Sequence, residues 1–167
     1  MAEIIQFVLG ILSSLPRELA VLLIAMTPVF ELRLAIPLGM TVFGMGPGEA
    51  LFWALLGNLI IVLPILFLYE AIADFLSRNN QLAARFFQWL FHKTRTKHSK
   101  SFARYGALAL VTFVAVPLPG TGGWTGSVAA FVFGVQKARA FLLIGLGILL
   151  AGIIVTFITL GGIKLMV

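Results

Sequence analysis

Glu31 and Arg33 are the residues of this sequence best placed to do chemistry, because both lie in the middle of an apolar segment. If that segment enters a lipid bilayer, each charge costs about 2.5 to 3.5 kcal/mol, so the two must be paired, hydrated or bound to a ligand. On a functional interpretation, Arg33 holds an anionic group while Glu31 takes up and releases a proton. The alternative is an internal salt bridge that locks the chain, and both roles can coexist.

Other polar side chains in the apolar parts of the chain carry less weight. No Asp or Glu occurs after Asp74, so the second half of the chain cannot supply a carboxylate for proton coupling. Glu70 lies near the end of its apolar segment, where snorkelling or capping suits it as well as coupling does. Asn58 lies inside that segment, where an amide more often bonds a neighbouring helix than a substrate. Both are therefore secondary site candidates.

A second constellation lies in the run from Pro117 to Gly126, which is rich in proline and glycine. Prolines end a helix, and glycines allow a turn whose backbone N–H and C=O groups need a ligand, water or facing protein. A half-helix that begins near Ser127 would add a positive dipole end, which attracts phosphate or carboxylate. The alternative is a tight turn whose glycines only permit close packing. The candidate substrate-binding side chains of this run are Thr121, Trp124 and Thr125.

Several chemistries have no support in the sequence. The chain has no cysteine, which removes disulfides, thiolate metal ligands and cysteine nucleophiles. His92 and His98 have no acidic or histidine partner at metal spacing, so we expect no metal site. No Walker loop, zinc-protease motif or nucleophile elbow occurs. We therefore expect no cofactor and a protein that is not an enzyme.

The composition places these residues in a membrane. Hydrophobic residues make up 60% of the 167 and charged residues 11%, which excludes a soluble domain. Seven of the twelve Lys and Arg residues fall between Arg78 and Arg104, and Lys137 and Arg139 follow. The positive-inside rule produces such clustering. We expect connector 78–104 to be cytoplasmic, with an amphipathic helix that meets anionic lipids and not nucleic acid.

The elements that position the candidate residues repeat along the chain. An interrupted apolar segment and a clean span, Glu49 to about Asp74, precede the connector, and an interrupted segment and a clean span, Ala138 to Ile163, follow it. The matched positions, about 90 residues apart, are Pro28 with Pro117, Phe43-Gly44 with Phe133-Gly134, and Gly57 with Gly147. We expect a single membrane domain, 1–167, with repeat 1 at about 19–76, a basic connector at about 77–105 and repeat 2 at about 106–163. The stretch from Ile4 to Leu12 is too short to span and predicts an interfacial helix.

Charge favours one topology for the interrupted segments. If both are re-entrant hairpins, the two clean spans run in opposite directions, and Lys137 and Arg139 share a face with the basic connector. The predicted fold is thus all-α, an inverted repeat of a re-entrant hairpin plus a full transmembrane helix, and the hairpin tips should meet at a protected midplane site. The residues that we assign to the backbone of the hairpins are Pro28, Pro37, Gly39, Pro117, Pro119, Gly120, Gly122, Gly123 and Gly126.

The motifs resemble those of a known family. The run from Pro28 to Gly39, the triplet Leu56-Gly57-Asn58 and the run from Pro117 to Gly126 together resemble the prokaryotic small multidrug export protein family. That family is similar, more distantly, to the DedA/VTT membrane proteins, whose members have two facing re-entrant hairpins with acidic and arginine residues near the tips. One departure from the DedA pattern is that the second run contains no arginine.

The resemblance implies a small transporter in the inner membrane of a prokaryote. Its substrate is either a drug, as the family name implies, or an anionic lipid such as a polyprenyl phosphate, as the DedA-like proteins imply. Membrane lipids and one such amphiphile are the expected partners. Because two spans and two hairpins shield a midplane site poorly, we also expect a homodimer. The alternative from another class is a non-transporting scaffold or lipid-binding assembly factor.

Overall fold

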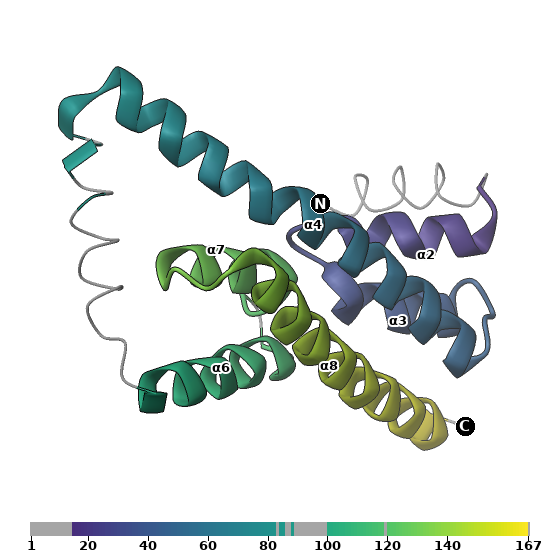
Figure 1. Ribbon diagram of the computed structural model, residues 1–167. Helices are drawn as coiled ribbons and strands as arrows, with labels where there is room; N and C mark the ends of the chain where they lie inside the picture. The colour runs from purple at the N-terminus through teal and green to yellow at the C-terminus, as the bar shows by residue number, and fades with distance from the viewer. Residues whose placement is uncertain (1–14, 83, 86–87, 89–99, 119, 167) are drawn as a thin grey trace. The chain divides into compact units, whose positions relative to one another are not determined.

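The computed structural model describes residues 15–82, 84–85, 88, 100–118 and 120–166 (Figure 1). The regular structure of these residues is helical throughout, which confirms the predicted all-α class for this part of the chain. The helices are α2 (Arg17–Met26), α3 (Glu31–Thr41), α4 (Pro47–Asn79), α6 (Lys100–Ala115), α7 (Gly123–Val132) and α8 (Lys137–Met166). The expected N-terminal interfacial helix and the middle of the connector, with His92 and His98, lie outside the described residues.

Among the described residues, two helices are long and apolar enough, by length and composition, to cross a membrane. They are α4 and α8, with candidate spans Pro47–Asn79 and Lys137–Leu165, where the sequence predicts its two clean spans. Both helices leave large apolar side chains exposed, among them Phe52 at 58%, Phe75 at 66% and Phe157 at 70%. Aqueous solvent disfavours such surfaces, whereas lipid tails accept them. The helices therefore indicate a membrane protein.

Each long helix follows a pair of short ones. The pair α2 and α3 precedes α4, and the pair α6 and α7 precedes α8, with direct packing within each pair. The breaks between the short helices fall at residues 27–30 and 116–122, which we call the first tip and the second tip. The order of two shorter helices and one long helix thus occurs twice in the described part of the chain.

The chain divides into two compact units. Unit 1 joins Met1–Asn58 with Gly152–Val167, so it contains α2, α3, the first part of α4 and the last part of α8. Unit 2 runs over Leu59–Ala151 and contains the rest of α4, the pair α6 and α7, and the first part of α8. Each unit therefore surrounds one of the two tips. The single-domain organisation stays a prediction.

Glycines mark the close helix contacts of unit 1. A Cβ on Gly57 of α4 would lie 2.3 Å from the carbonyl oxygen of Leu22, so α2 and α4 pack backbone against backbone. A Cβ on Gly39 of α3 would lie 3.0 Å from Cβ of Ala50, which places α3 against the start of α4. Close approach of this kind explains why small residues recur at the interfaces of membrane helices.

In unit 2, a glycine also lies at a close contact between two helices. A Cβ on Gly147 of α8 would lie 2.6 Å from Cβ of Val114 and 3.0 Å from the carbonyl oxygen of Val111, both on α6. Gly57 and Gly147 are matched in the sequence. Gly57 lies where α4 packs on α2, and Gly147 lies where α8 packs on α6. The two halves are therefore alike in this one glycine contact.

A second matched pair ends the second short helix of each half. Gly44 follows α3 with a φ of 61°, and Gly134 follows α7 with a φ of 65°. Both values lie in the left-handed region, which glycine adopts without the steric cost that a Cβ brings. After Gly134, the backbone N–H of Val135 donates to the carbonyl of Ala130 at 2.9 Å, which closes α7. The opposite orientation of the two halves stays a prediction.

Candidate functional site

The first tip is a tight turn that hydrogen bonds hold at both ends. The Thr27 hydroxyl donates to the carbonyl of Ile24 at 2.7 Å, which ends α2, and the N–H of Glu31 donates to the carbonyl of Thr27 at 3.2 Å, which begins α3. Pro28 lies between them in the turn, as predicted. The sequence prediction did not include Thr27, although the residue before a proline is disfavoured in the helical conformation and often ends a helix.

Glu31 has an unusual backbone conformation at this turn. Its φ of 48° is the only positive value among the described non-glycine residues. A left-handed conformation is costly for a residue with a Cβ, and such strain concentrates at functional sites. The turn thus fixes the start of the Glu31 side chain at the point where the chain enters α3.

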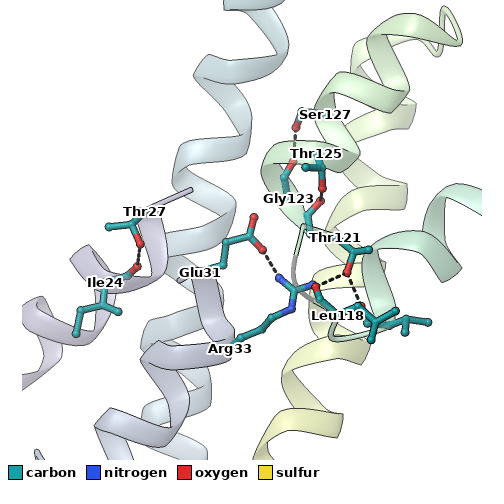
Figure 2. A network of polar contacts seen from close by, with 11 residues as sticks. Ile24, Thr27, Glu31, Arg33, Leu118, Thr121, Gly123, Thr125 and Ser127 are labelled. Atoms are coloured by element: carbon teal, nitrogen blue, oxygen red, sulfur yellow. Dashed lines mark hydrogen bonds and ion pairs between the residues drawn. The ribbon is translucent and has the colours of Figure 1, made fainter. Parts of the chain in front are cut away.

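The side chains of Glu31 and Arg33 form an ion pair next to this turn (Figure 2). Nη1 of Arg33 donates to Oε2 of Glu31 at 2.7 Å, the length of a strong charge-assisted hydrogen bond. The Glu31 side chain is 4% exposed, whereas that of Arg33 is 19% exposed. The carboxylate is therefore the inner charge of the pair, and the guanidinium is the outer one.

A second ion pair of unit 1 provides a contrast. Arg17 of α2 contacts Glu49 of α4 at 3.1 Å, but these side chains are 48% and 33% exposed. Arg17 also contacts the neighbouring Glu18 at 3.2 Å. A hydrogen bond from its own backbone amide, and then the Arg17 guanidinium, lower the pKa of Glu18 below its ordinary value. This cluster is solvated and lies at the first turns of its helices, so it has the features of a surface ion pair.

Pro37 and Gly39, which we assigned to the backbone of the first hairpin, lie inside α3. Proline lacks the N–H that would donate to the carbonyl four residues earlier, that of Arg33. Ala35, Ile36 and Gly39 are nevertheless buried, and this tertiary packing holds the helix through the proline. The break between α2 and α3 is therefore limited to residues 27–30.

Hydrogen bonds of the Thr121 hydroxyl hold the second tip together. The Thr121 hydroxyl lies 2.6 Å from the carbonyl oxygen of Val116 and 2.9 Å from that of Leu118, so it can donate to either across the turn (Figure 2). Gly120 and Gly122 have φ values of 82° and 147°, which let the chain reverse at once into α7. Pro117 is the second residue of this turn, and Pro119 lies outside the described residues. The hydroxyl of Thr121 therefore has a clear structural role.

Helix α7 begins at Gly123, earlier than the expected start near Ser127. Gly123, Trp124, Thr125 and Gly126 thus lie in its first turn and not in a loop. Gly126 is buried, and a Cβ there would lie 2.6 Å from Cγ2 of Val114, so close packing on α6 outweighs the low helix propensity of glycine. The predicted helix N-terminus, with its positive dipole end, is therefore present, but it lies at Gly123, directly after the second tip.

The first turns of α7 retain polar groups. The residue before the helix, Gly122, has no side chain to cap the first N–H groups, which are therefore the kind of donors that bind anions. The Thr125 hydroxyl lies 3.5 Å from the carbonyl of Gly122, and the Ser127 hydroxyl donates to the carbonyl of Gly123 at 2.7 Å. Trp124 and Thr125 are half-buried. The role of these side chains in binding stays a prediction.

The secondary candidates differ in what the structure shows of them. Asn58 lies on α4 and is completely buried, at 0% exposure. Glu70 also lies on α4, and its side chain is outside the described part. Among the described residues, no group of three or more His, Cys, Asp or Glu side chains could hold a metal ion. In the described part of the chain, the buried Glu31 is the one acidic candidate with a defined partner.

One comparison with known proteins gives a match. Over residues 31–154 the sequence matches a family described as "Putative small multi-drug export protein". No curated protein and no solved structure matches the chain. The matched range begins at Glu31 and includes Arg33, the second tip, α4 and most of α8. It covers most of the chain and confirms the family resemblance: this protein belongs to the small multi-drug export protein family.

Proposed function

We propose that this protein is a small membrane transporter that moves an amphiphilic molecule across the bilayer through a site that contains Glu31 and Arg33. Membership of an export family supports the transport role. The two apolar helices and their exposed phenylalanines support the membrane location. We place the protein in the inner membrane of a prokaryote, with the basic connector in the cytoplasm.

The helix lengths support re-entrant hairpins. Helices α2 and α7 have 10 residues each, α3 has 11 and α6 has 16. At 1.5 Å per residue these helices reach about 15 to 24 Å, so each is shorter than a ~30 Å hydrocarbon core. Because the two helices of each pair also pack against each other, each pair is suited to enter the membrane and return to the same side. Two hairpins of this kind make the halves an inverted repeat and keep Lys137 on the connector side.

The buried ion pair of the first tip is the observation that carries the proposed site. A buried pair is a poor source of stability, because apolar side chains of similar volume often stabilise a protein as well or better. Its presence next to a strained turn at the tip of a half-length helix pair therefore favours a functional role. Irregular backbone at this depth must line a cavity or be covered by protein.

The unequal burial of the pair supports a proposal for the charge of the substrate. Arg33 is the more exposed partner, so a ligand reaches the guanidinium before it reaches the carboxylate. Guanidinium groups bind phosphate and carboxylate through paired hydrogen bonds. We therefore propose a substrate with an anionic headgroup, such as a polyprenyl phosphate.

The same pair provides a route to proton coupling. When an anionic headgroup binds Arg33, it competes with the Glu31 carboxylate for the guanidinium. Weaker pairing makes the buried charged form of Glu31 more costly, which favours uptake of a proton by Glu31. Binding of one anion and one proton leaves the net charge of the site unchanged. Glu31 would thus be the proton carrier and Arg33 the headgroup ligand.

A thermal-shift experiment on the purified protein in detergent tests this proposal. Polyprenyl phosphate and tetraphenylphosphonium, a lipophilic cation, are added separately to the wild type, Arg33→Ala and Glu31→Gln. We expect the phosphate to raise the melting temperature of the wild type and not that of Arg33→Ala. Arg17→Ala and Glu49→Gln are matched controls, because they remove the exposed ion pair of the same unit.

The other outcomes are equally informative. Stabilisation by tetraphenylphosphonium that disappears in Glu31→Gln would show a cationic drug exporter and contradict the anionic headgroup. Binding of neither probe, together with a large loss of stability in both variants, would favour the scaffold alternative. An equal response of Arg33→Ala and Arg17→Ala to the phosphate would show that the buried pair is not the site.

A further inference from the structure

Asn58 is a buried polar residue whose structural role is unexplained. Its side chain is 0% exposed, and neither Nδ2 nor Oδ1 has a hydrogen-bond partner among the described residues. Buried side-chain amides are nearly always hydrogen-bonded, so each exception calls for an explanation. The bond to a neighbouring helix that the sequence suggested is thus not seen in the described part of the chain.

Packing does not require an amide at this place. The position that matches Asn58 in the second half of the chain is Ile148, which is 1% exposed on α8. An apolar side chain thus fills the corresponding place in unit 2 without any polar group. Because an unsatisfied buried amide lowers stability, the choice of Asn at residue 58 indicates a need other than stability.

Two contacts place Asn58 at the level of the first tip within unit 1. Gly39 of α3 faces Ala50 of α4, and a short turn makes these helices antiparallel. Glu31 lies eight residues before Gly39 and Asn58 lies eight residues after Ala50, so each is about 12 Å along its helix from that contact. The two buried polar residues therefore lie at the same height.

The second contact agrees with the first. Gly57, next to Asn58, packs against Leu22 and Ala25 in the last turns of α2, which ends at Met26 just before the tip. The contacts of α4 with α3 and with α2 thus both place Asn58 near the level of the first tip, where Glu31 lies. Because the ion pair is there, the carboxamide adds two N–H donors and one acceptor without adding charge.

We propose that Asn58 is a headgroup-binding residue of the Glu31–Arg33 site and that its N–H groups donate to an anionic oxygen of the substrate. This inference rests on the proposed function and narrows its substrate class to a phosphate-type headgroup. Arg33 supplies the charge, and the uncharged amide supplies additional donors that keep the site neutral. The ligand supplies the missing hydrogen-bond partner, which explains why the amide is tolerated in the core.

Two variants with the same branching of heavy atoms as Asn test this. Asn58→Leu removes the hydrogen bonds, and Asn58→Asp exchanges donors for a negative charge. Affinity for polyprenyl phosphate is measured by titration in detergent, alongside the melting temperature without ligand. We expect Asn58→Leu to weaken binding about tenfold, or about 1.4 kcal/mol, with an unchanged or higher melting temperature. Asn58→Asp should weaken binding further, because its carboxylate repels the phosphate.

Several results would overturn the role of Asn58. These are wild-type affinity in Asn58→Leu, a large fall in its melting temperature without ligand, and phosphate binding by Asn58→Asp that is as tight as in the wild type. Tighter binding of tetraphenylphosphonium by Asn58→Asp would show a cation site instead. If Arg33→Ala loses binding while both Asn58 variants keep it, the proposed function stands and this inference alone fails. A rise in the melting temperature with inorganic phosphate alone, equal to that with polyprenyl phosphate, would identify a free ion, and not a lipid, as the source of the anionic oxygen.

Discussion

Gly57→Ala should disrupt the packing that holds the first tip. The added Cβ would lie 2.3 Å from the carbonyl oxygen of Leu22 and 3.1 Å from Cβ of Ala25. Real Cβ atoms hardly ever approach heavy atoms closer than 3.0 Å, so α2 and α4 must separate by about 0.7 Å (3.0 − 2.3). The obstacle is backbone, which cannot rotate away as a side chain can. Overpacking of this kind costs about 1 to 3 kcal/mol, more than the roughly 0.5 to 1 kcal/mol that alanine gains in helix propensity.

The assay is the unfolding of the purified protein in detergent, followed by tryptophan fluorescence. Gly161→Ala is the matched control, because this glycine also lies in a long helix but has nothing within 4 Å of an added Cβ. We expect the control to unfold at the same or a higher temperature than the wild type, and Gly57→Ala at a clearly lower one. Transport should fall with Gly57→Ala as well, because a shift of α2 moves the turn at Glu31. Equal stability of the two variants would refute the close backbone contact.

Other substitutions test the remaining features. The double variant of Glu31→Gln with Arg33→Ala should be less destabilised than the sum of the single variants, with a coupling of about 1 kcal/mol or more in a double-mutant cycle, and additive effects would contradict the ion pair. Glu49→Gln should change the free energy of unfolding by less than about 1 kcal/mol, and a larger loss would show that the exposed pair is structural. Gly126→Ala should destabilise more than Gly145→Ala in the same unfolding assay, because its contact of 2.6 Å is closer than the 3.3 Å contact with a flexible leucine at Gly145.

The sequence predicts most of the helical framework. Apolar runs long enough to span give α4 and α8, and the first tip falls at Pro28 because proline ends a helix there. The matched glycines, Gly57 and Gly147, mark real backbone contacts at corresponding places in the two halves. These features depend on local chemistry and spacing, which a sequence states directly.

Tertiary packing decides the features that the sequence does not predict. Pro37 lies inside α3 and Gly126 inside α7, although both residue types disfavour helices, because their neighbours are buried against other elements. The left-handed backbone of Glu31 has no sequence signal, since glycine or asparagine is the usual residue there. Burial of Asn58 without a partner likewise becomes visible only when the surroundings of α4 are known.

The ion pair has one feature that the sequence predicts and one that it does not. The presence of Glu31 and Arg33 in an apolar segment predicts that they must be paired or bound to a ligand, and the 2.7 Å contact agrees with that prediction. Which of the two is the more exposed cannot be predicted from spacing, because it depends on how the turn at Thr27 directs the chain. We base the proposal of an anionic substrate on that difference in exposure.

Transport by the purified protein in sealed liposomes tests the central claim most directly. Wild-type protein, Arg33→Ala and the control Arg17→Ala are reconstituted at equal density, and the movement of a fluorescent polyprenyl phosphate between the two leaflets is timed. The account predicts movement with the wild type and the control, and a rate at the protein-free background with Arg33→Ala. Equal rates in the wild type and Arg33→Ala, or a wild-type rate no higher than that of empty liposomes, would contradict it.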